Sequence, residues 1–180
     1  MDARPLRCYL YRMAQAQASP AAVTHAIPKP PSRVLLVANR TATTPALLDV
    51  VDRRAAAGPA RFHLVVPATP RGLHRVVDPE VNGLVEARAQ VEAALPMLSE
   101  AAGGPVTGEV GVADPIAAIH DALFAQRFDE IIVSTLPRRI SRWLRLDLPS
   151  KARGFGLPVT HVEAQLPATA AEPAVVAAAS

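Results

Sequence analysis

The sequence predicts an α/β fold: a doubly wound parallel sheet of five strands in a single domain. Its 180 residues suit one domain, and half of them are hydrophobic, which is enough to form a core. Short continuous apolar runs alternate with longer segments in which apolar residues recur every three or four positions. Strands that alternate with helices pair in parallel through right-handed crossovers, so helices should cover both faces of the sheet.

The predicted strands are short runs rich in Val, Leu and Ile. The first of them is apolar without interruption, which is typical of a parallel strand buried on both faces. The third is weaker, because Gly108 and Gly111 interrupt it. The five predicted strands span residues 33–38, 61–66, 106–112, 129–134 and 158–162.

Three helices are predicted between the strands, and each begins at a polar residue followed by proline. Thr44, Asp78 and Asp114 are the predicted N-caps. Their side chains are suited to accept hydrogen bonds from first-turn amides, and proline suits the first helical position. The first of these helices should end at Gly58 and the second at Gly103.

The two ends of the chain are predicted to lie outside the domain. Residues 1–31 contain several prolines and no sustained apolar face, so we expect a disordered N-terminal tail. Met13 is an alternative initiator, which leaves the translation of residues 1–12 open. Residues 166–180 are rich in alanine and predict a loose C-terminal tail, so the α/β domain should span 32–165.

Positive charge is concentrated in two segments. The formal net charge is +3, but arginine and lysine gather in residues 1–32 and 137–153. The rest of the chain has more acidic than basic side chains. A local concentration of charge bears on the partners of a protein and not on its fold.

Composition excludes several classes of protein. Cys8 is the only cysteine, so no internal disulfide and no multi-cysteine metal site is possible. No apolar run approaches the roughly 18 residues of a membrane span. We therefore expect a soluble, cytoplasmic protein.

Familiar catalytic and metal-binding motifs are also absent. There is no GxGxxG after the first strand, no GxxxxGK[ST] and no GxSxG, and the five histidines show no metal-ligand spacing. His63 and His161 fall in predicted strands and are expected to be hydrogen-bonded structural residues. Asp129 and Glu130 are adjacent in a strand, so their side chains should point to opposite faces and not act as an acid/base pair. We expect no metal and no enzymatic activity.

A ligand site is expected where the parallel strands end. In doubly wound sheets, ligands bind outside the carboxyl ends of the strands, where strand order reverses. Here those ends are 38–44, 67–71, 111–114 and 134–139. The candidate ligand-binding residues within them are Asn39, Thr41, Asp114, Ser134, Thr135, Arg138 and Arg139.

The segment after the fourth strand has two interpretations. Ser134 and Thr135 precede Pro137 and a predicted basic helix, and hydroxyls, amides and arginines at a helix start bind phosphate oxygens. The alternative is an ordinary amphipathic helix with a solvated arginine face. Its apolar side would then be formed by Ile140, Trp143 and Leu144, and its basic side by Arg138, Arg142 and Arg145.

Residues 33–163 resemble the universal stress protein family, within the wider group of adenine-nucleotide-binding α/β domains. The resemblance is carried by the opening strand Val34 to Ala38, by Gly111 to Ile119 before the third helix, by Asp129 to Thr135, and by the closing strand Gly156 to Val162. It is nearest to a bacterial branch that lacks the glycine-rich ATP motif. Similar domains also occur as soluble tails of permeases, which suggests a transporter as one partner.

The resemblance implies strand order 3-2-1-4-5, a homodimer formed through the last strand, and binding of ATP or AMP. ATP-binding members carry G-x-x-G, about nine residues and then G-[ST], with an Asp after the first strand. This chain has Asn39 near the Asp, Ser134 to Pro137 in place of the first glycines, and Asp147 to Ser150 near the last. Proline and leucine crowd a backbone that would otherwise approach phosphate, so a smaller phosphate ligand, or a nucleotide held by arginines, is expected.

The expected function is therefore a non-enzymatic stress-response regulator that binds a nucleotide or phosphate-bearing ligand at the strand ends. The alternative is an interaction module that docks a basic helix, 138–153, on an acidic protein, a transporter or RNA. Nucleic acid is the less favoured partner, because the chain has few aromatic residues for base stacking. An enzyme of the related nucleotide-hydrolysing or nucleotidyl-transferring groups is disfavoured, because their HxGH and glycine-rich signatures are missing.

Overall fold

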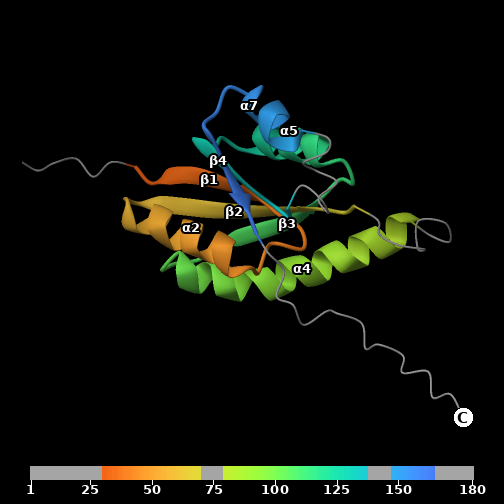
Figure 1. The fold of residues 1–180 in the computed structure, drawn as a ribbon, viewed down its shortest axis with the longest axis horizontal. Helices are drawn as coiled ribbons and strands as arrows, with labels where there is room; N and C mark the ends of the chain where they lie inside the picture. The colour runs from red at the N-terminus through yellow and green to blue at the C-terminus, as the bar shows by residue number, and fades with distance from the viewer. Residues whose placement is uncertain (1–29, 70–78, 138–146, 165–180) are drawn as a thin grey trace, which may run out of the picture.

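Five parallel strands form one sheet in the order β3-β2-β1-β4-β5 (Figure 1). The computed structural model describes residues 30–69, 79–137 and 147–164. The strands are β1 (Ser32–Val37), β2 (Ala60–Pro67), β3 (Thr107–Gly111), β4 (Glu130–Thr135) and β5 (Val159–Glu163). The predicted fold class and strand order are both confirmed. The predicted tails lie outside the described residues.

Helices cover both faces of the sheet, as the doubly wound prediction requires. Two of them, α2 (Pro45–Ala56) and α4 (Pro79–Ala101), lie on one face. The other two, α5 (Pro115–Ala125) and α7 (Leu148–Arg153), lie on the opposite face (Figure 1). Among the described residues, none of these helices is both long enough and apolar enough to cross a membrane.

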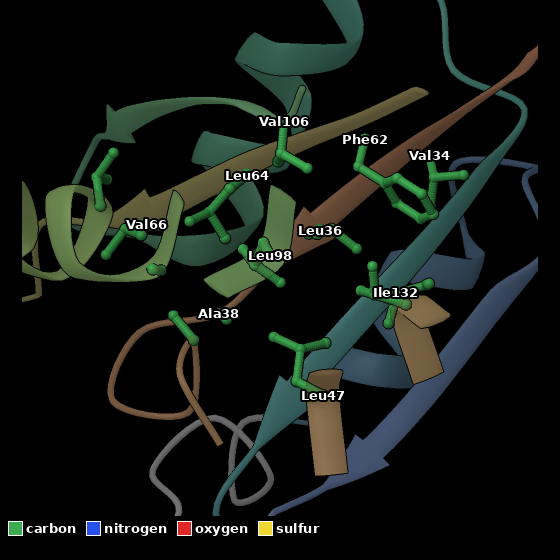
Figure 2. Close-up of a cluster of buried hydrophobic side chains, with 14 of the residues drawn as sticks. Val34, Leu36, Ala38, Leu47, Phe62, Leu64, Val66, Leu98, Val106 and Ile132 are labelled. Carbon is green, nitrogen blue, oxygen red and sulfur yellow. The ribbon is translucent and has the colours of Figure 1, made fainter. Parts of the chain in front are cut away.

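Successive side chains of each central strand pack alternately into two separate aliphatic clusters, one on each face of the sheet. In β1, Val34 and Leu36 face α2 and α4, whereas Leu35 and Val37 face α5 and α7. Figure 2 shows the first cluster, in which side chains of β1, β2 and β4 meet those of α2 and α4. Burying a Leu or Ile side chain contributes about 1.5–3 kcal/mol, so these two clusters supply the main stabilisation of the sheet.

The helix starts confirm one predicted cap and correct another. Asp114 Oδ1 accepts a hydrogen bond of 2.8 Å from the backbone N–H of Ala117, as predicted for an N-cap. The capping hydrogen bond predicted for the Thr44 side chain is wrong. Thr44 Oγ1 instead donates to the carbonyl of Thr41, 2.8 Å away, because the tight turn before α2 brings that carbonyl within reach. Asp78 lies outside the described residues.

The basic segment is not one continuous helix from 138 to 153. Asp147 has left-handed backbone angles (φ 55°, ψ 41°), and α7 begins only after it. A left-handed residue cannot belong to a right-handed helix, so the predicted single helix is wrong at this point. Residues 138–146 lie outside the described residues, and the predicted apolar face with Trp143 stays a prediction.

Candidate functional site

The order of the strands reverses between β1 and β4, which lie side by side in the middle of the sheet. The chain leaves β1 toward α2 on one face, and after β4 it reaches α7 on the other. The connections after these two strands therefore diverge. In sheets of this type, ligands bind at that point, outside the carboxyl ends of the strands. We call the described segments there, residues 38–44, 67–69, 111–114 and 134–137, the carboxyl rim.

Side-chain hydrogen bonds join neighbouring strands at their carboxyl ends. Every neighbouring strand pair in the described sheet has one, within the strand or just beyond its last residue. They are Thr69 Oγ1 to Ala113 O (3.0 Å, β2 to β3), Asn39 Nδ2 to Pro67 O (2.8 Å, β1 to β2), Thr41 Oγ1 to Ser134 O (3.0 Å, β1 to β4) and Thr135 Oγ1 with His161 Nε2 (2.7 Å, β4 with β5).

Asn39 and Thr41 thus fix the turn after β1 from both sides. Asn39 bonds toward β2 and Thr41 bonds toward β4, so the residue between them lies in a turn anchored to both neighbouring strands. Thr41 is 2% exposed, and a buried hydrogen bond of this kind is costly to break. These two predicted site residues are brought together, and both position the backbone at the point where strand order reverses.

Ser134 and Thr135 are adjacent in β4, and their side chains lie on opposite faces of the sheet. Ser134 shares the α2 face with Ile132, whereas Thr135 shares the α5 face with Val133. Thr135 bonds His161, but Ser134 Oγ is buried at 1% exposure and has no hydrogen-bond partner among the described residues. The two hydroxyls therefore do not converge on one point, although the Ser134 carbonyl meets Thr41.

The remaining predicted site residues are separated from this pair or lie outside the described residues. Asp114 follows β3, two strands away from β1, which corresponds to roughly 10 Å in a sheet. Its carboxylate caps α5. Arg138 and Arg139 are not described, so their role as phosphate ligands stays a prediction.

Arg40 is a candidate site residue that the sequence analysis missed. It occupies the turn between Asn39 and Thr41, its side chain is exposed, and no hydrogen bond or ion pair engages its guanidinium within the part of the chain that the structure describes. It is also the only arginine or lysine in the carboxyl rim. Its place directly after the first strand, at the carboxyl end of a parallel strand, is the sequence signal that indicates it.

The histidines and carboxylates set aside as structural do have structural partners. His63 Nδ1 shares a 2.7 Å hydrogen bond with Thr107 Oγ1. Asp129 Oδ2 accepts from the backbone N–H of Arg33 at 2.7 Å, and Glu130 pairs with Arg54 of α2. The expectation that His63 and His161 are hydrogen-bonded is confirmed. No group of three or more potential metal ligands occurs within the described ranges.

Burial lowers the pKa of the His161 imidazole below its usual value of 6.5. Nearby Arg153 lowers this pKa further, while Glu163 opposes both effects. The neutral ring is therefore favoured in the folded state. The unfolded chain, whose His161 keeps its ordinary pKa, takes up the proton first as pH falls.

We expect His161 to make the folded domain less stable as pH decreases through about 6.5. The stabilisation from the neutral ring is present above that pH and is lost below it. Urea unfolding of the wild type and of His161→Gln, compared between about pH 7.5 and 5, should show a steeper loss for the wild type. Parallel curves for the two proteins would contradict the assignment.

Comparison with known proteins supports the fold. No family model matches the sequence, and no curated protein sequence matches it. Solved structures of universal stress proteins do match. One in complex with cAMP is 18% identical, with a TM-score of 0.52, and covers 74% of this chain and 98% of its own.

Two further universal stress protein structures give the same result. The protein from Archaeoglobus fulgidus is 15% identical, with a TM-score of 0.52, over 73% of this chain and 93% of its own. A family member from Burkholderia pseudomallei is 17% identical, with a TM-score of 0.53, over 74% of this chain and 96% of its own. The chain therefore has the universal stress protein fold.

Proposed function

We propose that this universal-stress-protein-like domain is a non-enzymatic regulator that binds a nucleotide or another phosphate-bearing ligand at the carboxyl rim. The observation that carries the proposal is the reversal of strand order between β1 and β4. At that point the hydrogen bond from Thr41 to Ser134 joins the ends of the two strands. A structure of the same fold has been determined with cAMP, which supports an adenine nucleotide as the ligand class.

The residues present favour a ligand with a small phosphate group. The chain has Ser134 to Pro137 after β4, without a glycine, and Pro137 has no amide hydrogen to donate. Arg138 and Arg139 follow directly in the sequence and are suited to bidentate phosphate binding. In this proposal, AMP or a cyclic nucleotide fits better than ATP, and the turn at Asn39 and Thr41 lies beside the base or ribose.

Thermal unfolding with and without nucleotides tests the proposal. A ligand that binds only the folded state stabilises it, by about 2.7 kcal/mol at a hundredfold excess over its Kd. We expect AMP or cAMP to raise the Tm of the wild type, and we expect Arg138→Ala/Arg139→Ala to reduce that rise. The absence of any shift across AMP, cAMP and ATP at about millimolar concentration would contradict ligand binding.

The alternative proposal is an interaction module, and the exposed Lys151 and Arg153 of α7 favour it, because they extend the basic character of the segment before them. Replacing Arg142 and Arg145 with Glu separates the two proposals. A nucleotide site at the strand ends should survive this change, whereas docking on an acidic protein, a transporter or RNA should be lost. Docking on RNA would also weaken steeply with salt.

The proposal also includes an oligomeric state, a homodimer. β5 lies at an edge of the described sheet, and an unpaired edge can add the strand of a second copy. We therefore propose a homodimer formed through β5. Native mass spectrometry of freshly purified protein would report the subunit count and any co-purified ligand together.

A further inference from the structure

Arg40 occupies the turn that follows β1, at the point where strand order reverses. Its side chain is exposed, while Thr41 beside it is buried. Arg40 therefore presents its guanidinium to solvent from a position next to β4, where the proposed ligand would sit.

The turn that carries Arg40 is fixed before any ligand arrives. Asn39 Nδ2 donates to the Pro67 carbonyl at the end of β2, and Thr41 Oγ1 donates to the Ser134 carbonyl at the end of β4. The Ala42 N–H closes the turn by donating to the Asn39 carbonyl, 3.0 Å away. Binding thus requires ordering of the Arg40 side chain but not of its backbone, and a preorganised group binds with a smaller entropic cost.

The guanidinium of Arg40 has no internal partner among the described residues, in contrast to that of Arg54. Arg54 is half-buried and pairs with Glu130 at the opposite end of the sheet. Among the described residues Arg40 has no such pair. The acidic residues at the carboxyl ends of the described strands are Asp114 after β3 and Glu163 in β5, and each of these strands is two strands away from β1. Within the described residues, no ion pair neutralises its charge, which suits it to bind an anionic ligand.

We infer that the Arg40 side chain extends from this turn, which lies beside the base or ribose, to bind the anionic group of the ligand, and that this group is a phosphate. The inference rests on the proposed function, and it names the contact and the chemical group recognised. A guanidinium offers a planar pair of N–H donors that matches two phosphate oxygens, which gives geometric selectivity that a lysine ammonium lacks.

Isothermal titration with AMP and with adenosine tests the inference, because the two ligands differ only in the phosphate. Arg40→Ala should weaken AMP binding by about 10-fold to 100-fold and leave adenosine binding unchanged. Arg40→Lys should recover part of the loss, since it keeps the charge but not the paired donors. The matched control is Arg61→Ala, which removes the same charge from an exposed residue at the start of β2, at the other end of the sheet.

The outcomes separate this inference from the proposed function. If the wild type binds AMP and Arg40→Ala binds it equally well, Arg40 is not the phosphate contact, and the site itself stands. If Arg40→Ala and Arg61→Ala weaken AMP binding equally, only the net charge matters, and the inference is overturned. If the wild type binds neither AMP nor adenosine, the proposed function fails, and this inference fails with it.

Discussion

Replacing Gly111 with alanine should destabilise the domain by about 2–3 kcal/mol, because it inserts a methyl group into a space that is already filled. A Cβ at this position would lie 2.7 Å from the Cβ of Ala118 and 2.9 Å from Cγ1 of Val65. Ala118 belongs to α5 and Val65 to β2, so the strand and the helix would both have to shift. Urea unfolding of the wild type and the variant measures the loss directly.

Gly104→Ala is the matched control, since no heavy atom lies within 4 Å of a Cβ built at that position. We expect this control to change the free energy of unfolding by less than about 1 kcal/mol. Any change should be an increase in stability, because alanine restricts the unfolded chain. Equal unfolding midpoints for Gly111→Ala and Gly104→Ala would show that β3 and α5 can separate without cost.

Thr41→Val should cost about 1–3 kcal/mol, although valine has nearly the shape of threonine. The Thr41 hydroxyl is buried and donates to the carbonyl of Ser134 across the β1/β4 pair. Valine cannot donate, so the carbonyl at the end of β4 loses its side-chain partner, and the two strand ends lose their cross-link. The same variant should also lower the affinity of any ligand that binds beside this turn.

Thr41→Ser is the control for this second change, because it keeps the hydroxyl and removes only a methyl group. It should retain most of the stability and of the ligand affinity that valine loses. Unfolding free energies and Tm shifts with AMP, measured on both variants, give the comparison. If the serine variant loses as much stability and ligand affinity as the valine variant, the effect comes from packing and not from the hydrogen bond.

The sheet was predictable from sequence because its signals are local. β1, β2 and β4 are short, largely apolar runs, and the structure places each predicted strand end within one residue. The cap at Asp114 was predictable for the same reason, since it depends on a residue only three positions away. Strand order needed the family resemblance, because the spacing of apolar residues does not specify which strands become neighbours.

The arrangement of the rim was not predictable, because its contacts join distant parts of the chain. Thr41 and Ser134 are 93 residues apart, and nothing local indicates that one bonds the other. Thr44 matches a cap by sequence, but its hydroxyl has a competing acceptor in Thr41. Gly111 appeared only to weaken a strand, yet its lack of a side chain lets α5 lie close to β3.

The hydrogen bonds between neighbouring strand ends have a consequence for how the sheet moves. Fraying of β1, β2, β3 or β4 at its carboxyl end would disturb a side-chain hydrogen bond to a neighbouring strand, whereas the bond of β5 lies at His161, two residues before its end. A disturbance at the middle of the sheet should therefore reach its outer border, through the Thr135 and His161 pair. If the proposed ligand site and the proposed β5 dimer both exist, these bonds would connect them, and ligand binding would be expected to change the affinity of dimerisation.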